Sequence, residues 1–300
     1  MRTAHLPTSI HSTFFLIALL ISVGGAARAQ QACPVAVPIR TPAAANIFSA
    51  QQERALGDIE AEMVESTYHV AHDQELAVHL NDIAGRVLSH IPRNQTPVRI
   101  VLIDAPAAQS FSVGPERIYV SRKMVASLRN DDELAGLLGH ELGHVLAHQN
   151  ATMVTQLFHA ILAVDSVSDR KDISEKLLRV FNSIDHDRKA RKNSARILLQ
   201  QEGVAQRDAD RVALYASAAA GFSPQAYAEL FDRSAGTNGS SGSMLTDFFG
   251  TTTPDLRRFR EIKKALKQLP RSCREILPVV SPEFGTWQAA VMAGPDLARR

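Results

Sequence analysis

The sequence predicts a mainly helical α+β fold with a small β-sheet beside one central helix. Apolar residues recur at helical spacing through most of the chain. Runs of β-branched residues gather in one region, between residues 98 and 121. The chain has 300 residues, of which 45% are apolar and 21% charged, which is enough to build a substantial core. This composition excludes a disordered chain, a collagen-like repeat and a disulfide-dense mini-protein.

The first 29 residues have the features of a secretory signal. Arg2 precedes an apolar run over residues 14–23, and Ala27 and Ala29 form an A-x-A cleavage site. The run is too short to span a bilayer. We expect cleavage after Ala29 and export to the periplasm or the medium, with an uncleaved N-terminal anchor as the alternative.

The charge balance argues against nucleic acid as a partner. The chain has 33 basic and 31 acidic residues, and loss of the signal removes Arg2 and Arg28, which leaves equal numbers of each. A neutral protein lacks the electrostatic footprint of a nucleic-acid binder. Peripheral membrane association and the oligomeric state are left open.

The predicted signal places the two cysteines, Cys33 and Cys273, in an exported, oxidising setting. A bond between them would close a long loop and stabilise the protein by about 5 kcal/mol. Spacing alone does not show that the thiols meet, so a disulfide and two separate thiols are both open.

The helices are expected in the following order. Residues 30–48, rich in Pro and Ala, form an extended lead-in to a domain over 49–270. Ser49 and Gln52 form a capping box, and Asp73 begins a second helix that Pro92 stops. Further helices are expected over 131–148, 156–164 and 206–220, from Pro224 and after Pro254. Residues 185–192 predict a solvated charge run, 236–243 a solvated linker or a lid, and 271–300 a C-terminal tail.

The predicted sheet precedes the central helix. Residues 98–103 form a β-branched run, and 111–113 and 117–121 alternate around a turn at 114–115. The helix over 131–148 follows directly, so its side chains are expected beside the sheet.

That helix carries an H-E-x-x-H motif made of His140, Glu141 and His144. Residues four apart lie one turn apart on the same helix face, so both imidazoles can bind one metal ion. Glu141 can then take a proton from a metal-bound water. The alternative is a helix with surface histidines. His148 lies another turn along, too far for a tetrahedral site, and is read as a polar residue near the cleft.

The chain resembles the HtpX/BepA-like zinc metallopeptidases, metallopeptidase family forty-eight, which also contains the CAAX prenyl proteases. The resemblance covers roughly residues 50–268 and implies a zincin-type domain. It is similar to the soluble exported members that act in envelope protein quality control. The matching segments are 109–112, 117–122, 132–135, 139–148, 209–210 and 220–226.

The resemblance implies one Zn²⁺ per chain, bound by His140 and His144. The family's third ligand is a Glu four residues before the Asp of an Ala-Asp pair, and here Gln206 stands four residues before Asp210. A Gln carbonyl is a weaker ligand than a carboxylate, so zinc affinity should be lower. Glu202, one turn earlier, could replace it only through a backbone shift. Asp210 keeps the role of orienting a zinc-bound histidine.

A second departure lies at Thr253, where the resemblance leads us to expect His in a Thr-His-Pro sequence. The leading hypothesis is a zinc-dependent endopeptidase that cleaves unfolded or misassembled exported proteins, with Glu141 as general base. Because Gln206 and Thr253 both differ, a pseudo-peptidase serving as a binding or chaperone-like module is the alternative. A structural zinc protein is disfavoured, since structural sites usually close all four positions with Cys or His.

The resemblance also implies a strand that binds polypeptide substrates. The predicted strand over residues 117–121 resembles the family's edge strand beside the active site, with which an extended peptide could pair. An ordinary inner strand is the equal alternative. The strand contains Arg117, Ile118, Tyr119 and Val120.

Overall fold

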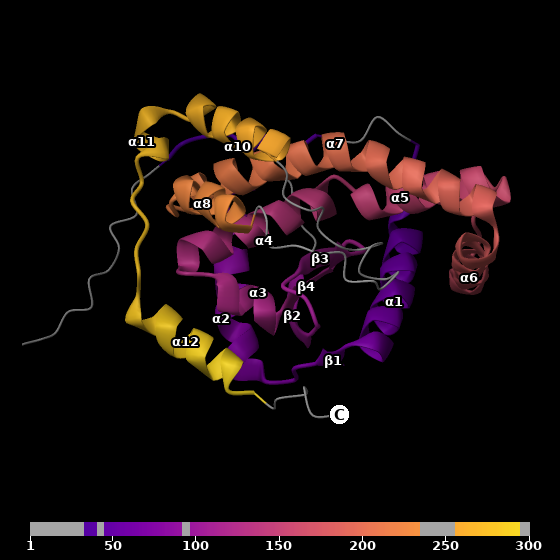
Figure 1. Ribbon diagram of the computed structural model, residues 1–300, viewed down its shortest axis with the longest axis horizontal. Coiled ribbons are helices and arrows are strands. Elements are labelled where there is room, and N and C mark those ends of the chain that lie inside the picture. The colour runs from indigo at the N-terminus through magenta and orange to yellow at the C-terminus, as the bar shows by residue number, and fades with distance from the viewer. Residues whose placement is uncertain (1–32, 41–44, 92–96, 235–255, 295–300) are drawn as a thin grey trace, which may run out of the picture. The chain divides into compact units, whose positions relative to one another are not determined.

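A computed structural model describes residues 33–40, 45–91, 97–234 and 256–294. The predicted signal over 1–29, the loop over 236–243 and Thr253 therefore lie outside the described residues. Within the described part, the fold is mainly helical with one small sheet, which confirms the predicted class (Figure 1).

The sheet has four strands in the order β1-β2-β4-β3. β2 and β4 are parallel, whereas β1 pairs antiparallel with β2 and β3 antiparallel with β4. β4 is therefore an inner strand, and the prediction that Arg117, Ile118, Tyr119 and Val120 form an edge for substrate is corrected. Both sides of β4 are already paired, and β3 is the outer strand next to it. The strands are β1 (His69–Val70), β2 (Arg99–Asp104), β3 (Ser110–Val113) and β4 (Arg117–Ser121).

The turn between β3 and β4 depends on glycine. Gly114 has φ 56°, a left-handed conformation that side chains disfavour. A Cβ atom at Gly114 would also lie 2.5 Å from the Cα of Gly57 on the first helix. Two glycines thus allow the turn to touch α1.

The helices begin where the sequence predicts the best-marked caps. Ser49 and Gln52 form the expected capping box, and Asp73 caps the second helix. The described helices before residue 235 are α1 (Ala50–Thr67), α2 (Gln74–Leu88), α3 (Arg122–Ser127), α4 (Asp131–Leu146), α5 (Gln149–Leu157), the π-helix η1 (Phe158–Leu162), α6 (Arg170–His186), α7 (Arg188–Ala219) and α8 (Pro224–Ser234). After residue 255 come α10 (Leu256–Gln268), α11 (Arg271–Arg274) and α12 (Pro282–Met292).

α4 and α7 pack closely against each other (Figure 1). Gly139 and Gly143 of α4 make this possible, since a Cβ at Gly143 would lie 2.8 Å from the Cα of Ala209. α7 is far longer than the predicted 206–220 helix, because it also includes the charge run that follows Asp187.

The C-terminal segment is packed rather than forming a tail. Phe284, Trp287 and Val291 are buried at helical spacing on α12, and the indole of Trp287 donates to the carbonyl of Leu76 at 3.0 Å. Cys33 and Cys273 form a disulfide, the paired alternative of the sequence prediction. None of the described helices is long and apolar enough to cross a membrane.

Candidate metal centre

α4 begins at a strong cap that fixes where its motif lies. The side chain of Asn130 accepts from the backbone N–H of Glu133 at 2.9 Å, and three acidic residues occupy the first turn. His140 and Glu141 then lie in the buried part of the helix, with 2% and 1% of their surfaces exposed. Such burial is unusual for these residue types and requires partners.

The two motif histidines face each other through one nitrogen each. Nε2 of His140 lies 3.0 Å from Nε2 of His144. Nδ1 of His140 lies 3.0 Å from a carboxylate oxygen of Asp210, and Nδ1 of His144 contacts the side-chain oxygen of Gln149. Both Nδ1 atoms therefore act as donors, so both Nε2 atoms present lone pairs to the same point.

This arrangement fits a divalent cation. Nitrogens that share one tetrahedral zinc at about 2.0–2.1 Å stand roughly 3.3 Å apart. Burial, followed by the proximity of His140, lowers the pKa of His144 to about 3. A histidine must be neutral to bind a metal, and His144 is held in that state.

Gln206 contributes a further oxygen to the α4–α7 contact region. The turn of α7 that contains it touches α4 through Ala209 against Gly143, and it touches α5 through a hydrogen bond from Gln149 to the carbonyl of Ala205. Oε1 of Gln206 is buried and has no hydrogen-bond partner among the described residues. A buried acceptor of this kind needs a hydrogen-bond donor or a cation. The described ranges contain no group of three or more His, Cys, Asp and Glu side chains that could hold a metal. The amide oxygen of Gln206 is a candidate to join the two imidazoles.

Asp210 lies behind His140 and is held by two residues that the sequence did not reveal. Tyr227 of α8 donates to the Oδ1 atom of Asp210 at 2.6 Å, and Arg258 of α10 donates to both carboxylate oxygens. Burial alone would raise the pKa of Asp210, but the charge and hydrogen bonds of Arg258 outweigh it and hold the pKa well below its usual range. Asp210 therefore stays ionised and accepts from His140.

One sequence signal could have found Arg258. It lies one turn before Ile262, which is 1% exposed, so its position is on the buried face of α10. Its Nη2 atom is also 3.4 Å from Nε2 of His140, which brings a cation beside the histidine pair. Tyr227 carries no comparable signal, because an aromatic residue on an apolar helix face is usually a core residue.

Glu141 points toward the outer strand of the sheet. Its Oε1 atom accepts a hydrogen bond from the hydroxyl of Ser110 on β3 at 2.7 Å. Burial raises the pKa of Glu141, and His140, the Ser110 hydroxyl and Arg258 oppose that shift. A carboxylate with a raised pKa takes up a proton more readily, as a general base must.

His148 lies outside this cluster. It follows α4 in a left-handed conformation with φ 51°, and its Nδ1 atom lies 2.7 Å from a carboxylate oxygen of Glu53. The structure thus gives it a partner on α1. The side chain of Glu202 is outside the described part of the chain.

Comparison with known proteins agrees with the motif. Residues 71–266 match Peptidase_M48, described as peptidase family M48. The β-barrel assembly-enhancing protease of Yersinia pestis is 25% identical over 107 residues, which cover 36% of this chain. The match spans 22% of that relative's length.

Proposed function

Because the chain belongs to peptidase family M48 and is a metallopeptidase, we propose that it is a zinc-dependent endopeptidase with its active site on α4. One observation carries the proposal: the Nε2 atoms of His140 and His144 converge at 3.0 Å while both Nδ1 atoms are engaged elsewhere. Gln206 is the proposed third ligand. Zinc, when bound, would acidify a water molecule and polarise the scissile carbonyl.

The chain's own residues then have separate tasks. Glu141 holds the proton taken from the attacking water and passes it to the leaving amine. Asp210 fixes the tautomer of His140, so that Nε2 carries the lone pair that the metal would bind. Ser110 fixes the carboxylate of Glu141.

Polypeptide substrates are proposed to pair with β3. This strand has no neighbour on its second side among the described strands, and it carries Ser110, which contacts Glu141. An extended peptide added there would lie beside the catalytic carboxylate with its backbone hydrogen bonds satisfied. This placement replaces the one on β4.

Export and a role in envelope quality control are part of the same proposal. The disulfide between Cys33 and Cys273 is typical of an oxidising compartment. The relative's name, a β-barrel assembly-enhancing protease, supports a substrate among misassembled envelope proteins. Unfolded polypeptides suit such a site, because strand pairing binds an extended backbone through its main-chain hydrogen bonds.

Glu141→Gln tests the reaction directly. The exported protein, loaded with zinc, is assayed on a denatured reporter protein together with Glu141→Gln and the exposed control Glu62→Gln. We expect Glu141→Gln to keep its zinc and lose activity by at least about a hundredfold, with the control unchanged. Equal activity in all three proteins, or cleavage by none of them with zinc bound, would refute the endopeptidase.

The second candidate is a binding module without catalysis, and Gln206 in place of a carboxylate favours it. Metal analysis of gently purified protein separates the two. Stoichiometric zinc that disappears in His140→Ala supports the enzyme. Absent zinc with retained binding of unfolded protein supports the module.

A further inference from the structure

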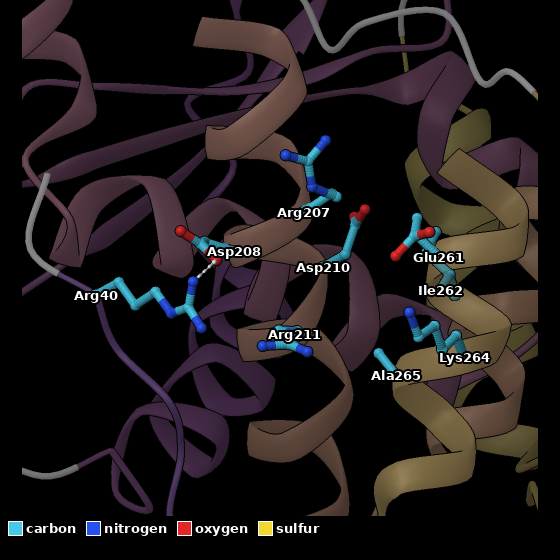
Figure 2. A pocket seen from close by; sticks show the side chains of 9 residues that line it. All are labelled: Arg40, Arg207, Asp208, Asp210, Arg211, Glu261, Ile262, Lys264 and Ala265. Carbon is cyan, nitrogen blue, oxygen red and sulfur yellow. Dashed lines mark ion pairs between the residues drawn. The ribbon is translucent and has the colours of Figure 1, made fainter. Parts of the chain in front are cut away.

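A basic pocket lies between α7 and α10, and Asp210 is one of the residues that line it (Figure 2). Its volume is about 240 Å³, which is room for several water molecules or a small ion with its hydration. Side chains from the segment 33–40, from α7 and from α10 line it. The H-E-x-x-H motif contributes no residue to this pocket.

The charges around the pocket do not balance. Asp208 is paired with Arg40 at 3.6 Å, and Asp210 is neutralised by Arg258. Among the other lining residues, three are cationic and one is a carboxylate. The cations are Arg207, Arg211 and Lys264, and the carboxylate is Glu261.

The three cations lack charged partners in the described ranges. Arg211 donates to the neutral side chain of Gln268 at 3.1 Å, and neither Arg207 nor Lys264 has an ion pair there. Arg207 and Arg211 are four apart on α7, so they share one face, while Lys264 comes from the opposite wall on α10. The lining of the pocket thus carries a surplus of two positive charges, which two helices supply.

We propose that this pocket binds a dianionic phosphate group. A phosphate monoester carries a charge of about −1.5 to −2 at neutral pH, which matches the surplus, and its three terminal oxygens can accept from both walls of the pocket. Arginine forks suit it by geometry as well as by charge. The group is a free phosphate or the phosphate of a lipid headgroup, and either one would join α7 to α10.

The consequence would reach the metal centre. Asp210 lines the pocket and α10 carries Arg258, so a ligand that ties α10 to α7 holds the pair together. Phosphate should therefore raise the midpoint of thermal unfolding above that in chloride of equal ionic strength. Phosphate binding in this pocket does not require peptidase activity, so the two properties are tested independently.

The test measures binding of inorganic phosphate by calorimetry. Arg207→Gln/Lys264→Gln removes two pocket cations, and Arg196→Gln/Lys267→Gln removes two exposed cations from the same helices outside it. We expect the pocket variant to bind about tenfold more weakly and the control to match wild type. Glu261→Gln should bind more tightly than wild type. No saturable binding, or equal weakening in both double variants, overturns the proposal.

Vesicle binding distinguishes a lipid headgroup from a free phosphate as the source of the group. Flotation with phosphatidylcholine vesicles, with and without phosphatidic acid, is compared with binding of free phosphate. Flotation that needs phosphatidic acid and fails in the pocket variant supports a headgroup. Binding of free phosphate alone supports a soluble ligand, and binding of neither refutes the site.

Discussion

Arg258 holds Asp210 with a pair of hydrogen bonds, from Nε to Oδ2 at 2.9 Å and from Nη2 to Oδ1 at 2.6 Å. Both groups are buried, with 9% and 3% of their side chains exposed. A buried charge pair contributes little net stability, but loss of one partner leaves the other uncompensated. The bond between Asp210 and His140 therefore depends on a residue from α10.

Arg258→Gln should destabilise the protein by about 3–5 kcal/mol and weaken zinc binding, because Asp210 loses its counter-charge. Urea unfolding and competitive zinc titration measure the two effects. Arg260→Gln, an exposed change on the same helix, is the matched control. If the two variants behave alike, Asp210 does not need Arg258.

Gln206→Glu should raise zinc affinity by at least about tenfold, since a carboxylate replaces a neutral amide oxygen in the proposed ligand set. The same change should destabilise the metal-free protein, because it buries a charge without a partner. Thermal unfolding with zinc and with a chelator will show both effects as a wider gap between the two midpoints. Gln74→Glu, an exposed change on α2, should leave the gap unchanged. An unchanged gap in Gln206→Glu would place the third ligand elsewhere.

The sequence predicted what short-range rules control. Ser49, Asp73 and Asn130 cap helices through contacts within a few residues, so their helices begin as expected. The order of strands was not predictable in this way. Whether β4 is inner or outer depends on β3 folding back beside it, and the alternation of side chains is the same in both cases.

The same distinction between local and long-range contacts applies to the site. His140, Glu141 and His144 lie on one helix, where spacing alone brings them together. Tyr227 and Arg258 come from helices 87 and 118 residues after His140, and no local pattern specifies such a contact. Likewise, α12 packs on the domain where the sequence predicts a tail, because the surface that buries Phe284, Trp287 and Val291 comes from distant parts of the chain.

The disulfide between Cys33 and Cys273 stabilises the apolar cluster next to the metal centre. It lies in the apolar cluster that also contains Tyr227 and Ile262. Cys33→Ser/Cys273→Ser should lower the free energy of unfolding by about 2–5 kcal/mol. Dithiothreitol should lower the stability of the wild type by a similar amount and leave the double variant unaffected. A reductant effect that persists in the variant would contradict this assignment.

Glu60 of α1 should make stability depend on pH. It is fully buried, and its carboxyl oxygens have no hydrogen-bond partner among the described residues. Burial raises the pKa of Glu60 from 4.5 to about 8, and the nearby Asn150 amide only partly opposes the shift. Between these two values the folded protein holds a proton that the unfolded chain releases. The contribution of Glu60 to the free energy of unfolding therefore falls as pH rises, by about 1.4 kcal/mol per pH unit.

Glu60→Gln isolates this effect, because the amide has the same shape and does not titrate. Urea unfolding at pH 5, 6, 7 and 8 should show the variant gaining on the wild type at each step, with the smallest gain in the last step, where the folded carboxyl itself begins to ionise. The accumulated gain should be largest at pH 8. Glu62→Gln, an exposed change two residues along α1, should track the wild type across the series. A constant difference between Glu60→Gln and the wild type would mean that Glu60 has the same protonation in both states, and its burial would then have to be compensated by a group still unidentified.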